Sequence, residues 1–190
     1  MKMEKSFRTF IALKIIPDNT FIKLYSKLKD NLKDENIKWV EQNNFHLTVR
    51  FLGVTSSTQV NEIETVIESI GRKYKSFSFD LKGLGYFKSK GKPRVLFAKT
   101  EETQALKLLK TEIEDQVEKF GFEKEQRKFN PHLTLGRIKY LNENHKFLLL
   151  IQEFAETEIQ KVNVSEIIFY QSILNSTTPV YKPIKTFKLN

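Results

Sequence analysis

Histidine and threonine occur twice in the same four-residue pattern. His46-Leu47-Thr48-Val49 and His132-Leu133-Thr134-Leu135 each lie in a run of apolar and β-branched residues. Because successive side chains of a strand point to opposite faces, each copy places its imidazole and its hydroxyl on one face and its aliphatic side chains on the other. Two such strands can gather two imidazoles and two hydroxyls around one small pocket, an arrangement suited to acid/base chemistry on a phosphate.

The residue types fit that chemistry. Histidine titrates near neutral pH, so one imidazole can take a proton from water while the other donates a proton to the leaving oxygen. Thr48 and Thr134 can donate hydrogen bonds to the phosphoryl oxygens. One isolated copy would most simply be structural, but two copies with the same alternation favour catalysis. His145 lies in a polar stretch without a partner pattern, and we predict that it is a surface residue.

The two motifs occupy similar places in two similar series of predicted elements. The first series has a strand at 9–16, a helix beginning within 17–20, strands at 37–40 and 45–52, a helix opening at 56–58 and a strand at 77–87. The second has a strand at 95–99, a helix at 103–120, a strand at 131–138, a helix at 143–154 and strands at 162–174 and 181–189. Phe10 precedes the first motif histidine by 36 positions and Phe97 precedes the second by 35, which indicates an internal duplication.

This order predicts an α+β fold with two lobes related by a pseudo-two-fold axis. Each lobe would contribute an antiparallel sheet to a central cleft, with the helices outside and the two motifs facing each other. A chain of 190 residues suits one domain, and we expect residues 1–190 to form a single domain of two intertwined lobes.

Composition narrows the class of protein. The formal net charge of +9 favours polyanionic partners such as nucleic acid, and the absence of cysteine excludes disulfides and thiolate metal sites. We find no hydrophobic leader and no segment long enough to span a membrane. We therefore expect a soluble, cytoplasmic protein without membrane association that acts as a monomer.

Other catalytic classes lack their motifs. The three histidines show no metal-binding spacing and no cluster of carboxylates accompanies them. The sequence has neither a Gly-x-Ser-x-Gly elbow nor a Gly-x-x-x-x-Gly-Lys phosphate loop. The prediction is a metal-independent reaction that needs no cofactor.

Three segments together resemble the 2H phosphoesterases, and more closely the bacterial and archaeal RNA 2′,3′-cyclic phosphodiesterases once named 2′-5′ RNA ligases. The segments are 44–53 (NFHLTVRFLG), 93–97 (PRVLF) and 131–137 (PHLTLGR), and the likeness extends to the strands around Tyr170 and Tyr181. The resemblance implies a single 2H phosphoesterase domain that hydrolyses the terminal 2′,3′-cyclic phosphate of RNA to a 2′-phosphomonoester. It also implies that His46 is the proton donor and His132 the proton acceptor, an assignment that spacing alone leaves open.

Further contacts to the RNA end are predicted from position. Arg50 lies four residues after His46 and thus on the same face of the strand, so it is a candidate either for a phosphate contact or for a salt-bridged rim. Arg137 follows Gly136, where a bend could turn it toward the pocket, although an ion pair is the slightly favoured interpretation. Arg94 and Arg127 are candidates for backbone-phosphate contacts, the basic turn 88–93 is another, and Tyr86, Phe87 or Phe129 could stack on a terminal base.

Two alternatives stay open at the level of sequence. One is the reverse reaction, in which RNA ends are joined through a 2′-5′ linkage at the same site. The other is a basic RNA-binding module whose histidines only bind phosphate, and such a module would show no turnover.

Overall fold

The computed structural model describes residues 5–174 and 179–190. Its helices are α1 (Asn19–Asn31), α2 (Ser57–Lys73), α3 (Gln104–Glu118) and α4 (Asn144–Glu153), with one 3-10 turn, η1 (Gln42–Asn44). Its strands are β1 (Ser6–Lys14), β2 (Asn36–Trp39), β3 (His46–Ser56), β4 (Phe77–Ser89), β5 (Lys92–Thr100), β6 (His132–Tyr140), β7 (Glu158–Val164), β8 (Glu166–Ile173) and β9 (Val180–Lys188). The predicted α+β class is confirmed.

Local sequence explains where the helices begin. The Asp18 carboxylate accepts a hydrogen bond from the Phe21 amide at the start of α1, and Thr103 caps α3 in the same way. At α2, Ser56 and Gln59 exchange side-chain and backbone hydrogen bonds in a capping box. Each helix presents an apolar stripe, such as Ile63, Ile67 and Ile70 of α2, to the core.

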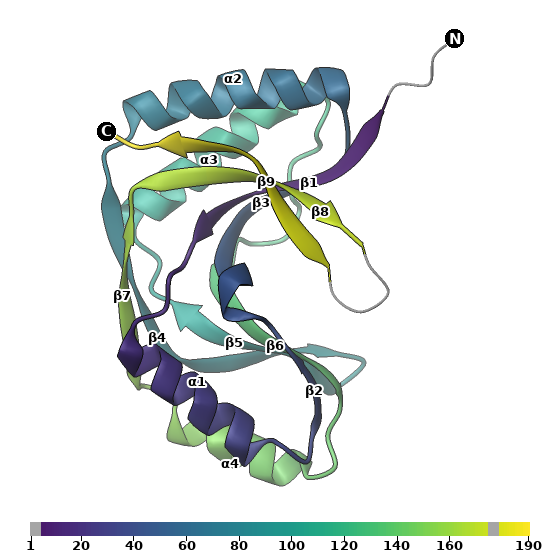
Figure 1. Cartoon of the computed structure of the whole chain (residues 1–190), viewed down its shortest axis with the longest axis vertical. Helices are drawn as coiled ribbons and strands as arrows, with labels where there is room; N and C mark the ends of the chain where they lie inside the picture. Colours follow the sequence, from purple (N-terminus) through teal and green to yellow (C-terminus); the bar gives the residue numbers. More distant parts are fainter. Residues whose placement is uncertain (1–4, 175–178) are drawn as a thin grey trace.

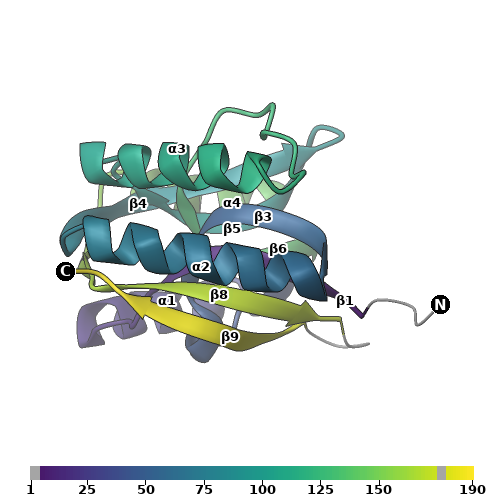
Figure 2. The same cartoon turned by 90° about the horizontal axis from the view of Figure 1, so that it is seen from above.

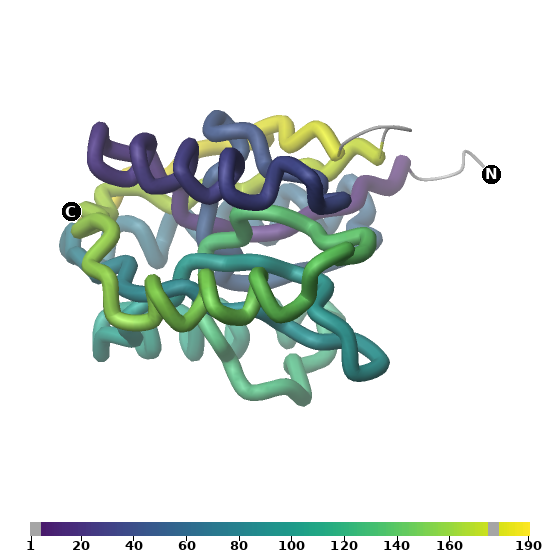
Figure 3. The backbone as a smooth tube through the Cα atoms, turned by 90° about the horizontal axis from the view of Figure 1, so that it is seen from below, coloured from purple at the N-terminus to yellow at the C-terminus, as the bar shows by residue number. Residues whose placement is uncertain are grey.

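All described strands pair antiparallel in one sheet, in the order β7-β4-β5-β6-β3-β1-β8-β9, with β2 pairing β6. The sheet bends through an arc: α2 and α3 cover one half, β3-β1-β8-β9, and α1 and α4 cover the half with β7, β4, β5, β6 and β2 (Figures 1, 2 and 3). The helices and the main core lie on the outer side of the bend. The opposite side of the sheet is the inner face.

The two predicted sheets are therefore joined into one. The junction is narrow, because β3 and β6 pair at Leu47 and Leu133 only. Both leucines are fully buried in the main core, which runs through both halves of the sheet. The sequence pattern could not reveal this junction, because apolar alternation marks the buried face of a strand and not its neighbour.

The predicted strand 162–174 is wrong. It is two strands, β7 and β8, with Ser165 between them. β7 pairs β4 in one half of the sheet, whereas β8 pairs β1 and β9 in the other. The hydrophobic pattern continues across Ser165 because both strands are buried, so only the change of partner separates them. His145 is exposed on α4, as predicted.

No helix in the described part of the chain combines the length and the apolar character needed to span a membrane.

Candidate active site

The two His-x-Thr motifs meet on the inner face of the sheet. Leu47 of β3 pairs with Leu133 of β6, and both point into the core, so the motif side chains on either side of them point the other way. Because the strands run antiparallel about this pair, His46 lies on the side of Thr134 and Thr48 on the side of His132. The sequence prediction that the motifs share one site agrees with this arrangement.

Each imidazole is held by the backbone two residues before it. His46 Nδ1 lies 2.6 Å from the Asn44 carbonyl oxygen, and His132 Nδ1 lies 2.8 Å from that of Asn130. A carbonyl oxygen only accepts hydrogen bonds, so Nδ1 carries the hydrogen in both rings. The matched bonds leave Nε2 of each ring as the atom that can exchange a proton.

Aromatic rings pack against both imidazoles. The His46 ring centroid lies 5.1 Å from that of Phe10 and 5.1 Å from that of Tyr181. The His132 centroid lies 4.8 Å from that of Phe87 and 5.2 Å from that of Phe97. These contacts fix the ring planes and remove water from one side of each imidazole.

Burial and charge both disfavour imidazolium. Burial lowers the pKa of His46 to about 4; the hydrogen bond to Asn44 opposes this shift, and the charges of Arg137 and His132 add to it. Burial also lowers the pKa of His132, again with a contribution from Arg137. These effects show that Arg137 and the two histidines share one electrostatic environment. In the free protein both imidazoles are mainly neutral at pH 7.

The packing of the Phe97 ring on His132 depends on a glycine, Gly85. Gly85 of β4 pairs with Phe97 of β5, and a Cβ atom at Gly85 would lie 2.6 Å from the Phe97 ring. Glycine thus lets Phe97 lie against His132 at this point.

Arg50 does not share the face of His46. β1 pairs Ala12 with Thr48 but Ile11 with Arg50, so Val49 is the extra residue of a β-bulge. The bulge reverses the alternation and turns Arg50 to the helix side of the sheet, where the residue is only 5% exposed. The expectation of a shared face is wrong for this reason.

The Arg50 guanidinium lies close to two carboxylates and one backbone carbonyl on that side. Nε lies 3.2 Å from Glu114 of α3, Nη1 lies 3.2 Å from Glu125, and Nη2 donates to the Glu123 carbonyl. Lys110 of α3 also contacts both Glu114 and Glu125. Burial by itself would raise the pKa of Glu125, but the hydrogen bond from Lys110 and the charges of Lys110 and Arg50 lower it overall. The cluster anchors the loop 119–131, which leads into His132.

A similar β-bulge brings Arg137 to the inner face. β5 pairs Phe97 with Thr134 but Leu96 with Gly136, so Leu135 is bulged and Arg137 returns to the face of His132. Arg137 is exposed, and no ion pair to it is found in the part of the chain that the structure describes. The structure thus agrees with the bend toward the pocket and not with the ion pair that the sequence slightly favoured.

The remaining predicted contacts lie in β4, in β5 and in the loop that precedes β6. Arg94 is exposed near the start of β5 and donates to the Lys139 carbonyl, and Arg127 is exposed in loop 119–131. Phe129 packs against the main core beneath Lys110, with 5.4 Å between the ammonium nitrogen and the ring centroid. It therefore helps to anchor loop 119–131. Tyr86 packs on Phe147 of α4, and only Phe87 of the proposed stacking residues lies beside a motif histidine.

Sequence reasoning missed the aromatic side chains on the His46 side. Phe10 pairs with Phe51 across β1 and β3 and with Tyr170 across β1 and β8, and Tyr181 packs edge-on against it. We call Phe10, Phe51, Tyr170 and Tyr181 the aromatic row. The position of Phe51 on the inner face depends on the bulges in β3, which simple alternation does not predict.

No group of three or more His, Asp or Glu side chains suited to a metal ion occurs among the described residues.

Comparison with known proteins gives a consistent result. Residues 9–189 match a family model described as the AKAP7 2'5' RNA ligase-like domain. A protein of Thermotoga maritima named RNA 2',3'-cyclic phosphodiesterase is 35% identical over 177 residues, covering 92% of this chain and 91% of its own. A protein of Aeropyrum pernix with the same name is 33% identical over 166 residues, covering 86% and 93%. The crystal structure of E. coli LigT with 3'-AMP has the same fold, with a TM-score of 0.77 at 21% identity and coverage of 97% and 99%.

Proposed function

The chain belongs to the AKAP7 2'5' RNA ligase-like domain family of 2H phosphoesterases and is an RNA 2′,3′-cyclic phosphodiesterase, and we propose that its two motif histidines catalyse the hydrolysis as an acid and a base. The observation that carries this mechanism is the matched environment of the two imidazoles. Both are bound at Nδ1 by a carbonyl and both lie beside a motif threonine on the inner face.

The proposed reaction uses the Nε2 atoms of the two rings. His132 Nε2 accepts a proton from water as the water oxygen attacks phosphorus. The bond from phosphorus to the 3′ oxygen breaks, and His46 Nε2, protonated at that point, donates its proton to this oxygen. The product is a 2′-phosphomonoester. The donor and acceptor assignment comes from the resemblance of the two motifs to those of the family, and the geometry is compatible with it.

Thr48, Thr134 and Arg137 can stabilise the negative charge on the phosphoryl oxygens. Hydroxyl groups of Thr48 and Thr134 flank the phosphate position and can donate to its non-bridging oxygens. Arg137 adds a positive charge on the same face. A bound phosphodiester carries one negative charge, which raises the pKa of both histidines relative to the free protein and favours the protonated donor.

We also propose that the chain is a single domain of two intertwined lobes that arose by duplication. The strand order is symmetric about the β3–β6 junction, since β7-β4-β5-β6 on one side corresponds to β9-β8-β1-β3 on the other. Lys14 pairs with His46 and Lys99 with His132, and each motif strand has its bulge at the same place. This register matches Ala12 with Phe97, two residues away from the match of Phe10 with Phe97 that the sequence spacing favours. Because one chain supplies both motifs, we propose a monomer.

Incubation with a short RNA that ends in a 2′,3′-cyclic phosphate tests the function. We expect turnover to a 2′-phosphate, identified by its resistance to enzymes that need a free 2′-hydroxyl. A second RNA with a 5′-hydroxyl end, added at high concentration, measures 2′-5′ joining, which we expect to be minor because water greatly outnumbers RNA ends. Binding of RNA without turnover would support the binding-module alternative and contradict the proposal.

A further inference from the structure

The segment before each motif histidine lies against the strand of the other motif. β2 and η1 lead into the first motif, and β2 pairs with β6, the strand of the second. Loop 119–131 leads into the second motif, and its Glu123 carbonyl accepts a hydrogen bond from Arg50 of β3, the strand of the first. The segments reach the two imidazoles through the carbonyls of Asn44 and Asn130. The position of each imidazole therefore depends on how its own segment is fixed.

The two segments are fixed by different means. β2 pairs with β6 over its whole length, and the Val40 amide donates a hydrogen bond of 2.9 Å to the Leu135 carbonyl. For residues 123–130, by contrast, no backbone–backbone hydrogen bond is found in the described part of the chain. This stretch is held through side chains, so a side-chain substitution can release it without breaking a strand pairing.

Four charged side chains hold the stretch, and we call them the ion cluster: Arg50, Lys110, Glu114 and Glu125. Arg50 Nη1 lies 3.2 Å from one Glu125 oxygen, and Lys110 Nζ lies 2.7 Å from the other. The Glu125 amide donates to the Glu114 carboxylate at 3.4 Å. Arg50, Lys110 and Glu114 are buried, so two positive and two negative charges compensate one another where little water reaches them. The loss of one of these charges cannot be made up by solvent.

The ion cluster lies behind the catalytic site and not in it. Arg50 is turned to the helix side of the sheet and is buried there, so its guanidinium faces away from a substrate on the inner face. Its influence follows the chain. Lys110 lies over the Phe129 ring, and the next residue is Asn130, whose carbonyl lies 2.8 Å from Nδ1 of His132. The ion cluster thus reaches within one residue of the group that sets the His132 tautomer.

We propose that Arg50 and Glu125 are positioning residues for His132. They fix the stretch so that the Asn130 carbonyl keeps Nδ1 protonated and leaves Nε2 to accept the proton of the attacking water. The proposal rests on the proposed function, in which His132 is the proton acceptor. His46 has no such dependence, because the pairing of β2 with β6 holds its segment. A weakened ion cluster therefore disturbs one motif histidine and spares the other.

Three variants change the ion cluster in different ways. Arg50→Met removes the guanidinium and keeps most of its apolar stem. Glu125→Gln removes one charge from the loop and keeps the shape of the side chain. Arg50→Lys keeps the positive charge but loses the planar fork that contacts several acceptors at once, so it should recover part of what Arg50→Met loses.

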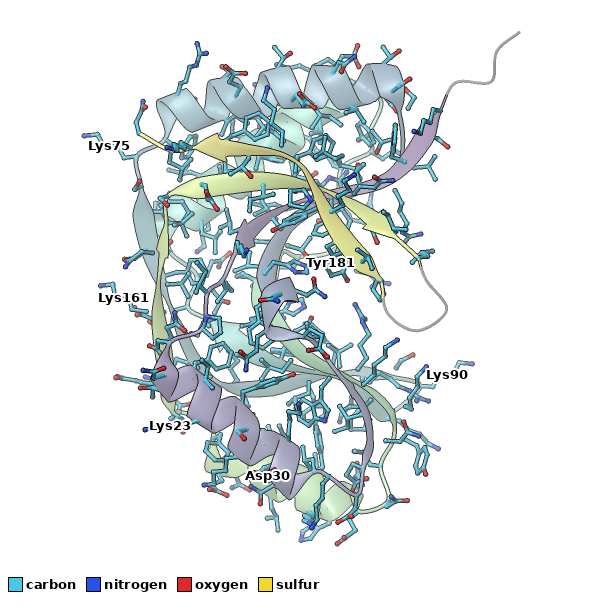
Figure 4. All side chains as sticks on the ribbon, viewed as in Figure 1. Lys23, Asp30, Lys75, Lys90, Lys161 and Tyr181 are labelled. Atoms are coloured by element: carbon cyan, nitrogen blue, oxygen red, sulfur yellow. The ribbon has the colours of Figure 1, made fainter. Side chains whose placement is uncertain are left out.

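Glu112→Gln on the same helix is the matched control. The Glu112 carboxylate lies 2.8 Å from Lys73 Nζ and accepts a hydrogen bond of 2.9 Å from the Tyr74 hydroxyl. It therefore also makes an ion pair between elements, but at another place. Figure 4 shows Lys75, the residue after Tyr74, at the outer edge of the molecule and well away from Tyr181, which packs on His46.

The first measurement is ¹⁵N NMR of the histidine rings without substrate, at about pH 8, where both imidazoles are neutral. In the wild type we expect both rings in the Nδ1–H tautomer, as their carbonyl contacts require. In Arg50→Met and Glu125→Gln we expect His132 to become a mixture of the two tautomers while His46 stays unchanged. Glu112→Gln should leave both rings as in the wild type.

The second measurement is the kinetics of hydrolysis of an RNA that ends in a 2′,3′-cyclic phosphate. A displaced proton acceptor slows the chemical step and leaves the substrate contacts in place, so we expect Arg50→Met and Glu125→Gln to lower kcat about tenfold with little change in KM. Arg50→Lys should restore part of kcat, and Glu112→Gln should have no effect. Circular dichroism confirms that each variant is folded at the assay temperature.

An unchanged His132 tautomer in Glu125→Gln would overturn the proposal, and this variant serves even if Arg50→Met does not fold. Equal mixing of tautomers at both histidines would also overturn it, because that result indicates general loosening. So would a raised KM with unchanged kcat, which would assign the residues to substrate binding. Failure of the wild type to hydrolyse the RNA would instead refute the proposed function, whereas the tautomers are measured without turnover.

Discussion

At the residue scale, each motif imidazole combines one carbonyl that sets its tautomer with aromatic rings that exclude water. Burial lowers the pKa of both histidines below its usual range and the charge of Arg137 adds to this shift, whereas the hydrogen bond to the carbonyl opposes it. The sequence predicted the imidazoles and hydroxyls themselves, because a repeated tetrapeptide needs only the alternation of a strand. It could not predict Phe51 or the orientation of Arg50, since both depend on a bulge.

We predict that Arg137→Gln raises the pKa of both histidines, because the charge of Arg137 lowers both. Titration of the histidine ring signals by NMR without substrate measures this shift directly. Arg127→Gln is the control, since the exposed Arg127 is not among the charges acting on either ring. A pKa of His46 that does not change in Arg137→Gln would remove Arg137 from the electrostatic environment of the site.

The pH dependence of kcat/KM follows from the same shifts. This ratio reports the free enzyme, in which the singly protonated histidine pair is the active form. Since both histidine pKa values lie below 6.5, we expect a bell-shaped profile with its maximum below pH 6.5, with activity falling as the pair loses its remaining proton at higher pH. The alkaline limb of kcat should lie at higher pH, because the bound anion stabilises the protonated pair. An alkaline limb of kcat/KM well above pH 7 would contradict this account.

At the element scale, the bulges in β3 and β6 decide which side chains reach the inner face. Helices and most strands were predictable from apolar periodicity and capping residues. The division of 162–174 into β7 and β8 was not, because it reflects which strand each part pairs with and not its composition. Loop 119–131 has no secondary structure that a sequence pattern could predict, yet the ion cluster of Arg50, Lys110, Glu114 and Glu125 anchors it.

We predict that Arg50→Met lowers the free energy of unfolding by about 3 kcal/mol, since its removal leaves the buried Glu114 carboxylate with less compensation. Urea denaturation measures the loss. In the double variant Arg50→Met/Glu125→Gln, the loss should be smaller than the sum of the two single losses, because the residues interact. Full stability of Arg50→Met together with a raised KM for RNA would instead assign Arg50 to substrate binding.

At the scale of the whole molecule, one bent sheet brings two distant segments together at the single pair Leu47 and Leu133. The chain places the two motifs 86 positions apart, and the antiparallel junction makes them neighbours. Sequence symmetry indicated that the motifs would meet, but it could not show that the halves share one continuous sheet. The net charge of +9 gives the molecule a general attraction for RNA.

We predict that the rate of hydrolysis is unchanged by EDTA and is not raised by added Mg²⁺, Mn²⁺ or Zn²⁺. In the described residues the groups at the site are imidazoles, hydroxyls and a guanidinium, without carboxylates gathered to bind a cation. Measurement of the rate after dialysis against chelator, with each metal added back separately, checks this. Loss of activity with EDTA and recovery with one metal would contradict a mechanism based on two histidines alone.

The central claim is that His46 donates and His132 accepts a proton, and one comparison tests it most directly. Wild type, His46→Ala and His132→Ala are assayed on two RNA ends, one with the normal 3′ oxygen and one with sulfur at that position of the cyclic phosphate. Both variants should lose about 10²-fold to 10⁴-fold on the oxygen substrate. A thiolate leaves without protonation, so His46→Ala should recover most of its rate on the sulfur substrate while His132→Ala should not. Recovery by His132→Ala instead would reverse the roles, and undiminished activity of either variant on the oxygen substrate would contradict the mechanism.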